Sequence, residues 1–220
     1  MCGRYALYGP RSRTRSRAEA DYFSSLEQFP GSWNVAPGQT LPITRLRDGE
    51  IEQVVARWGL VPYWSKDEKI AYKCINARAE TVATTPAFRG PYAKRRRCLV
   101  PACGFYEWQK HPAGKQPYYI TSADGSLLAL AGLWDVWKKP DGAALTTFTI
   151  ITTTPNELTR RLHDRMPVIL EPDDYRTWLE AEDPRELLKP AAADLLQCYP
   201  VSSRVNSPKN DAPDLIAPSG

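Results

Sequence analysis

Cys2 has the greatest capacity for chemistry in this sequence, because it directly follows the initiator Met1. Once Met1 is removed, Cys2 carries a free α-amine and a thiol on adjacent carbons. The ordinary pKa of an α-amine is about 7.7–8.0, so its neutral form is available to attack an aldehyde and give a Schiff base. The thiol can then close onto the same carbon as a thiazolidine ring, in an intramolecular step. Two alternatives are a thiolate that attacks an acyl carbon and a small buried apolar residue.

Three further residues suit proton transfer or substrate positioning. His163 lies in LHDRMP, and histidine is the acid–base group best matched to neutral pH; its alternative role is to cap the end of a helix. Glu107 lies among aromatic residues in GFYEW, where desolvation would raise its pKa, unless it lies on the exposed face of an edge strand. Asn76, in INARAET, offers a donor and an acceptor to a polar substrate, or forms a turn.

Basic residues provide candidate contacts to a polyanion. They are Arg4, Arg78, Arg165, the run 94–97 and the alternating RSRTRSR segment at 11–17. Both clusters are also consistent with solvated surface. The chain has 29 Lys and Arg against 25 Asp and Glu, a net charge of +4, which permits a nucleic-acid partner without requiring one. Seven Trp and eleven Tyr offer faces on which bases can stack.

Cysteine and histidine usage argues against a metal site. The chain has five cysteines, no CxxC pair and only two histidines, so we expect no structural zinc and reduced thiols. The N-terminus lacks the apolar segment of a secretion signal, and no run reaches the length of a membrane span. We therefore expect a cytoplasmic protein, associated with the nucleoid if the source is bacterial, and no membrane partner.

Apolar runs separated by turn residues predict a mainly antiparallel, bent sheet in one α+β domain over 1–220. Strands are expected within 54–64, twice within 97–108, and at 117–122, 127–137 and 145–153. Asp124-Gly125 is a strong signal for a hairpin, and a second turn is expected at 140–142. The segment 33–42 is rich in Pro and Gly, so we expect a loop there.

Helices are expected mainly toward the C-terminus. Apolar spacing predicts one short helix over 18–29, and Pro172 is placed to begin another. Thr154-Pro155-Asn156-Glu157 is a capping box that predicts a helix to about residue 162. A similar pattern at 183–186 predicts a later helix, and the last 20 residues, or at least the final ten as a tail, are expected to be irregular.

Taken together, several segments of the chain resemble one family, the SOS response-associated peptidase (SRAP) family. Its motifs occur here in order: MCGRY, NVAPGQ, RWGLVPYW, NARAET, RCLVPACGFYEW, AGLW and HDRMP, with VSSRVNSPKND as a closing segment. The resemblance implies a pseudo-barrel built from a bent sheet with a few flanking helices, in agreement with the fold expected from the strand pattern.

The resemblance also implies a function. Members of the family recognise abasic sites in single-stranded DNA and bond to them covalently through the N-terminal cysteine. Cys2 is then the nucleophile that forms the thiazolidine, and Asn76 forms a hydrogen bond near the linkage. Glu107 assists proton transfer, and His163 is a second acid or base or holds the opened sugar. No metal or organic cofactor is implied.

The implied partner is single-stranded DNA that contains abasic sites, on replication-associated DNA, bound by a monomer. Arg4, Arg78 and Arg165 are the implied phosphate contacts, and the chemistry combines lyase-like and peptidase-like steps. One alternative is a cysteine peptidase that uses Cys2 and His163, or that only removes its own Met1. A second alternative is a passive module that binds single-stranded DNA.

Overall fold

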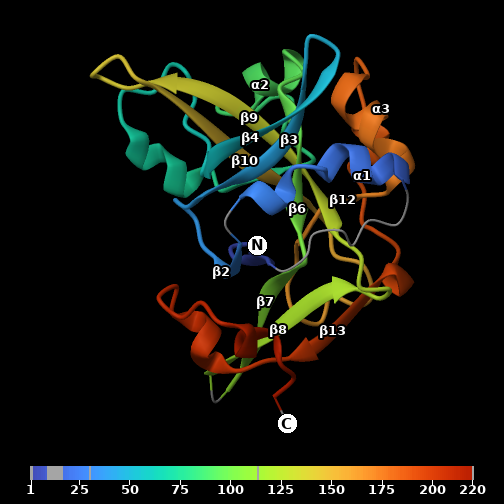
Figure 1. Cartoon of the computed structure of the whole chain (residues 1–220). Coiled ribbons are helices and arrows are strands. Elements are labelled where there is room, and N and C mark those ends of the chain that lie inside the picture. The colour runs from blue at the N-terminus through green and yellow to red at the C-terminus, as the bar shows by residue number, and fades with distance from the viewer. Residues whose placement is uncertain (1, 9–16, 30, 113, 220) are drawn as a thin grey trace.

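Two β-sheets form the body of the molecule (Figure 1). A computed structural model describes residues 2–8, 17–29, 31–112 and 114–219 of the chain. The Arg-rich segment at 11–17 lies almost entirely outside these ranges, so its expected role stays a prediction. Within the described ranges, none of the helices has the length and apolar character of a membrane-spanning segment.

Five strands of the larger sheet close into a ring. In spatial order they are β10 (Ala144–Thr153), β4 (Glu50–Trp58), β3 (Thr40–Arg47), β6 (Arg97–Ala102) and β9 (Leu128–Lys138). Pairing of β9 with β10 closes the ring, and only the contact between β4 and β10 in it is parallel. Three short strands extend this sheet: β5 (Asn76–Arg78), β11 (Met166–Pro167) and β12 (Ile169–Leu170).

The smaller sheet is antiparallel throughout and includes β1, the strand that follows Cys2, next to its edge strand β2. Its order is β13 (Leu196–Pro200), β8 (Gly114–Ser122), β7 (Gly104–His111), β1 (Tyr5–Leu7) and β2 (Ser32–Val35). Strands β6 and β7 are separated only by Cys103, so one segment of chain passes directly from the ring into the smaller sheet. The arrangement confirms the predicted α+β pseudo-barrel with a bent, mainly antiparallel sheet.

The helices are few and short. They are α1 (Arg17–Phe23), α2 (Arg89–Ala93) and α3 (Tyr175–Glu180). Single 3₁₀ turns occur at Leu26–Gln28, Glu68–Lys73, Pro172–Asp174, Arg185–Leu187, Ala193–Leu195, Ser203–Asn206 and Pro213–Ile216. The prediction that Pro172 begins a helical segment is confirmed, whereas the segments at 18–29 and 183–186 form less helix than expected.

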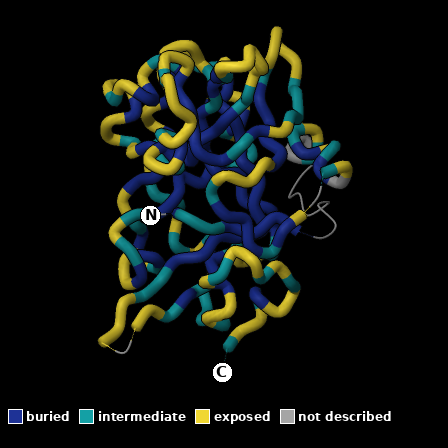
Figure 2. Tube along the Cα trace, turned by 90° about the vertical axis from the view of Figure 1, so that its left-hand side faces the viewer, coloured by how far each residue is buried: buried dark blue, intermediate teal, exposed yellow. Residues whose placement is uncertain are grey.

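Apolar side chains fill the ring and the space between the sheets. Figure 2 shows buried chain running through the centre of the molecule and exposed chain mainly at its periphery. Within the core, the ring of Tyr5 on β1 lies 5.2 Å from that of Trp58 on β4. Trp58 in turn stacks on Phe148 of β10. These contacts join the strand that follows the N-terminal cysteine to the interior of the larger sheet.

Three local predictions were wrong. The turn at Asp124-Gly125 does not make a hairpin, because β8 pairs with β7 and β13, whereas β9 pairs with β6, β10 and β12. The segment 33–42 is not one loop, because it contributes to β2 and β3. Arg97 is not on a solvated surface: it is buried, and its guanidinium donates hydrogen bonds to three carbonyl oxygens at the end of α3, those of Trp178, Ala181 and Glu182.

The last 20 residues, expected to be irregular, form two 3₁₀ turns, Ser203–Asn206 and Pro213–Ile216, and the segment is attached to the smaller sheet. The side-chain amide of Asn34 on β2 donates to the carbonyl oxygens of Val205, Ser207 and Asn210. An isolated bridge pairs Val201 with Pro218. The segment therefore closes one side of β2 and supports the strand next to the N-terminal residues.

Candidate functional site

Cys2 lies just ahead of β1, an inner strand of the smaller sheet between β7 and the edge strand β2. The Tyr106 amide of β7 donates to the Arg4 carbonyl oxygen at 2.9 Å, and Tyr5 pairs with Phe105. Continued toward the N-terminus, this register sets Gly3 against Glu107. The side chain of Cys2 is fully buried, and burial raises the pKa of its thiol well above the ordinary range, with the charge of Glu107 adding to the rise.

Glu107 is a buried carboxyl group on a central strand. It lies on β7, between β1 and β8, and pairs with Tyr118. The residue is only 2% exposed, and burial raises its pKa to about 7. The predicted desolvation is therefore confirmed, and the alternative of an exposed edge strand is wrong. A carboxyl group with this pKa is present in both protonation states near neutral pH, which suits it to give and accept protons.

His163 lies in a turn that faces β7. The predicted helix over 154–162 is wrong, because the chain forms only hydrogen-bonded turns there. Asn156 replaces Thr154 as the capping residue: its side-chain oxygen accepts from the amide and the hydroxyl of Thr159. The side-chain amide of Gln109 on β7 donates to the Arg161 carbonyl oxygen at 3.3 Å, which joins the turn to the strand that carries Glu107.

The charge of Asp164 acts on both His163 and Glu107. Desolvation lowers the pKa of His163, and Lys110 of β7 and Arg165 lower it further, against the opposing effect of Asp164. The charge of Asp164 also contributes to the raised pKa of Glu107. The lowered pKa of His163 therefore favours the neutral form of its ring at pH 7, and Asp164 lies near enough to both groups to act on each.

Asn76 is the first residue of β5, at the edge of the ring, and it is less directly connected to the other candidate residues. Its side-chain nitrogen donates to the carbonyl oxygen of Ile150 on β10, at 3.4 Å. Its side-chain oxygen is buried and accepts no hydrogen bond from any described residue. The neighbouring Ile75 carbonyl accepts from the Trp58 indole, whose ring contacts Tyr5. No hydrogen bond joins Asn76 to Cys2, Glu107 or His163 within the described residues.

The three predicted phosphate contacts differ in how far their guanidinium groups are engaged. Arg4 donates to the side-chain oxygen of Asn34 at 2.7 Å and to the carbonyl oxygen of Val205 at 2.8 Å. Arg165 forms a bidentate pair with Glu80. Arg78 is exposed and forms no ion pair among the described residues. Arg78 is therefore the best placed of the three to meet a phosphate without giving up an existing contact.

Glu80 is the residue of this neighbourhood that sequence reasoning missed. It belongs to the same NARAET motif as Asn76 and Arg78, so the motif itself was the available signal. Its carboxylate pairs with Arg165, 85 positions later in the chain, and this pairing lowers the pKa of Glu80. Because Arg165 is so far from Glu80 in the sequence, the sequence alone did not indicate that the two residues pair.

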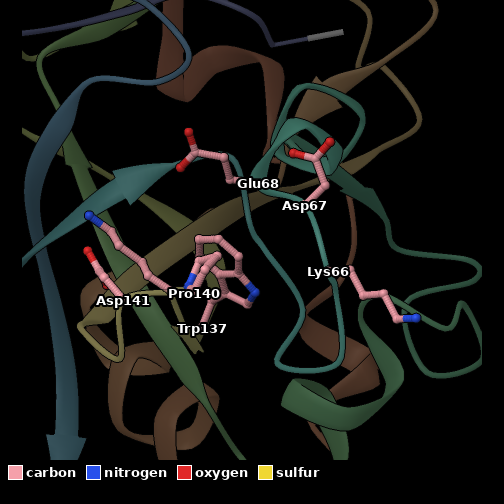
Figure 3. Close-up of a pocket in the computed structure, with 7 residues that line it drawn as sticks. Lys66, Asp67, Glu68, Trp137, Pro140 and Asp141 are labelled. Carbon is pink, nitrogen blue, oxygen red and sulfur yellow. The ribbon is translucent and has the colours of Figure 1, made fainter.

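A separate hollow of about 420 Å³ lies away from these residues (Figure 3). It is lined by Lys66, Asp67, Glu68, Trp137, Lys139, Pro140 and Asp141. Asp67 accepts from the Lys69 amide, and Glu68 pairs with Arg57, so these carboxylates already serve the local structure. Among the described residues, no three His, Cys, Asp or Glu side chains come together as metal ligands. The hollow is therefore lined by none of the predicted site residues, and its carboxylates form no metal site with described residues.

Fold and site together define a small protein with a closed ring of strands, in which Cys2 is buried and lies close enough to the buried Glu107 carboxyl group to feel its charge. The family model for SOS response associated peptidase (SRAP) matches residues 1–208. The chain belongs to this family.

Relatives of known name and structure cover nearly the whole chain. Abasic site processing protein YoqW of Bacillus subtilis is 45% identical over 98% of this chain and 99% of its own. Abasic site processing protein HMCES of Gallus gallus is 34% identical over 99% of this chain and 78% of its own. A crystal structure of a Bacteroides thetaiotaomicron protein has a TM-score of 0.81 at 30% identity, covering 99% of this chain and all of the other.

Proposed function

We propose that this protein processes abasic sites in single-stranded DNA by forming a covalent thiazolidine through Cys2 after Met1 has been removed. The names of its relatives support the DNA lesion as substrate. The position of Cys2 against the strand that carries Glu107 is the observation that carries the chemistry. A nucleophile and a group able to move its protons at neutral pH are thereby neighbours.

The raised pKa of the Cys2 thiol supports an order of events in which the amine reacts first. The amine bonds to C1′ of the ring-opened sugar aldehyde, and Glu107 accepts the proton that the nitrogen gives up. The aldehyde oxygen takes up a proton and becomes the hydroxyl group of a carbinolamine. This hydroxyl group leaves as water with a proton from an acid, the nitrogen gives up its remaining proton, and an imine forms. The sulfur then bonds to the same carbon, and the thiol proton ends on the nitrogen. The net change is the loss of one water molecule.

The same raised pKa counts against general cysteine peptidase activity. A peptidase of this kind needs a thiolate, which neighbouring positive charge normally stabilises. Here burial and Glu107 both oppose the thiolate, and the lowered pKa of His163 opposes an imidazolium partner. Peptidase-like chemistry is therefore proposed only for removal of Met1, which uncovers the amine.

Intact mass spectrometry tests the proposal. Untagged protein with a free Cys2 amine is mixed with single-stranded DNA that carries one abasic site and is then denatured. We expect a species at the combined mass less one water, which is missing when undamaged DNA of the same sequence is used. Unrelated peptides incubated with the same preparation should stay intact. If a free Cys2 amine gives no adduct, the covalent mechanism is wrong.

Arg78→Ala is expected to weaken binding of undamaged single-stranded DNA without affecting the fold. Arg78 is exposed, so its loss removes one phosphate contact and little packing. The slope of log affinity against log salt should fall by about 0.7, as measured by fluorescence anisotropy. Arg47→Ala removes another exposed arginine charge, at the end of β3, and should leave the slope unchanged. Equal slopes for Arg78→Ala and wild type would remove Arg78 from the DNA contacts.

A further inference from the structure

Arg165 is held by two elements of the larger sheet. Its guanidinium donates to both oxygens of Glu80, at 2.6 and 2.9 Å, and also to the Thr152 carbonyl oxygen at 2.6 Å. The same carbonyl accepts from the Ala79 amide at 2.8 Å. Glu80 follows β5, Thr152 lies near the end of β10, and Arg165 precedes β11. This clamp, defined as Glu80, Arg165 and Thr152, therefore fixes the turn before β11 to the edge of the sheet.

The clamp bears directly on His163, because the Arg165 amide donates to Nδ1 of its ring at 3.0 Å. A ring nitrogen that accepts a hydrogen bond carries no proton, so the neutral ring then has its proton on Nε2. Asp164 competes for the same atom: its carboxylate lies 2.7 Å from Nδ1, a contact that needs Nδ1 to be protonated. The two contacts favour opposite tautomers of the ring.

Burial decides between the two contacts. The Asp164 side chain is 83% exposed, and an exposed pair of this kind contributes little because solvent screens it. The Arg165 side chain is only 12% exposed, and its bidentate pair has the planar geometry that a guanidinium and a carboxylate prefer. The backbone amide of Arg165 is thus held in place, whereas the Asp164 carboxylate is free to rotate into solvent.

We infer that Glu80 is a positioning residue, which holds Arg165 so that its amide keeps His163 as the Nε2–H tautomer facing the site. In this arrangement His163 donates the proton on which water leaves the carbinolamine, and Glu107 accepts the proton from the amine. The part of this inference that concerns the two proton transfers rests on the proposed function. The tautomer itself does not depend on that function.

The clamp gives Arg165 a structural role in addition to the expected phosphate contact, which stays a prediction. Its guanidinium already donates three hydrogen bonds to protein oxygens and is mostly buried. Two of the five guanidinium N–H donors, Nε among them, form no hydrogen bond within the described residues. Glu80 serves the geometry of His163 at some cost to DNA affinity, since it places a negative charge close to Arg78.

Glu80→Gln tests the inference, because it keeps the size of the side chain and removes its charge and one acceptor oxygen. Glu180→Gln is the matched control: Glu180 also forms a bidentate pair, with Arg176, on α3. The adduct rate at saturating DNA, the affinity for undamaged single-stranded DNA and the ¹⁵N shifts of the His163 ring are measured for both. The sequence has only His111 besides His163, so His111→Gln assigns the spectrum.

We expect Glu80→Gln to lower the saturated rate by about tenfold, with DNA affinity equal to or tighter than that of wild type. The His163 shifts should move away from those of the Nε2–H tautomer, and Glu180→Gln should match wild type in all three measurements. Unchanged ¹⁵N shifts in Glu80→Gln would overturn the inference, as would weaker DNA affinity with a wild-type saturated rate. A wild-type protein that forms no adduct would contradict the proposed function, while the ¹⁵N shifts would still test the clamp.

Discussion

Cys2→Ala is expected to abolish the denaturation-resistant adduct with abasic DNA completely. The variant keeps an N-terminal amine once Met1 is removed, so it can still form a Schiff base with the aldehyde. Without sulfur the imine has no intramolecular nucleophile to close onto it, and it hydrolyses on denaturation. Cys2→Ser should behave in the same way, with a side chain closer in size to that of the buried cysteine. The measurement is intact mass after denaturation, with and without prior borohydride reduction.

Borohydride separates the two halves of the chemistry. Both variants should give an adduct only when the imine is reduced before denaturation, whereas wild type should give one in either case. Cys198→Ser is the matched control, because Cys198 is a partly exposed thiol on β13. It should form the adduct at the wild-type level. A full-strength adduct from Cys2→Ala without borohydride would show that another residue supplies the covalent bond.

The strands were predictable from sequence, because burial and local turn chemistry point to the same boundaries. Apolar runs at 117–122, 127–137 and 145–153 correspond to β8, β9 and β10, and the turn at 140–142 joins the paired strands β9 and β10. The turn at Asp124-Gly125 has equally good local chemistry: Asp124 accepts from the Ser126 amide and hydroxyl. Local hydrogen bonds reverse the chain without deciding which strand it will pair with, so this hairpin prediction failed.

The predicted helix at 154–162 failed because tertiary hydrogen bonds compete with the capping box. The Asn156 side chain donates to the Ala191 carbonyl oxygen, 35 positions away, while its oxygen holds Thr159. The Asn156 amide points at the sulfur of Met166. These contacts fold the segment into compact turns and bring His163 to β7. A sequence pattern that considers only the next four residues contains none of these partners.

In the candidate site too, the sequence predicted the surroundings of one residue but not the partners of others. The aromatic surroundings of Glu107 in GFYEW were sufficient to predict its desolvation. The partners of the arginines were not predictable: Arg4 binds Val205, 201 positions later, and Arg165 binds Glu80. Charge and motif position identify which residues gather at a site. Whether an arginine contacts DNA or protein depends on which distant segments of the chain the fold brings next to it.

Glu107→Gln is expected to slow adduct formation by at least about a hundredfold, the typical contribution of a positioned acid or base. With its pKa near 7, the carboxylate form of Glu107 accumulates as the pH rises from 6 to 8. The wild-type rate should therefore rise through pH 7, with the Cys2 amine contributing a further rise near its own pKa, ordinarily about 7.7–8.0. The variant should lose the first rise and keep the second. Single-turnover rates across this pH range provide the measurement.

Glu50→Gln is the matched control for charge removal, since Glu50 is an exposed carboxylate at the start of β4. It should reproduce the wild-type pH profile. Burial is the main cause of the raised pKa of Glu107, the Trp108 amide lowers this pKa and the charge of Asp164 raises it. Asp164→Asn should therefore shift the first rise of the pH profile slightly to lower pH without removing it. A Glu107→Gln variant with the wild-type rate and both rises would exclude Glu107 from the proton transfers.

The raised pKa of Glu107 also predicts the sign of a stability effect that is independent of DNA. The folded state holds the proton up to about pH 7, whereas the unfolded chain releases it near the ordinary value of 4.5. Folding thus takes up a proton between these values, and wild-type stability falls as the pH rises through this window, by about 3 kcal/mol at most. Glu107→Gln cannot ionise, so its melting temperature should exceed that of wild type at pH 8 and approach it at pH 5. We interpret a carboxylate that destabilises the fold near neutral pH as one that is kept for its chemistry. This interpretation requires Glu107→Gln to form the adduct more slowly than wild type and to be more stable than wild type.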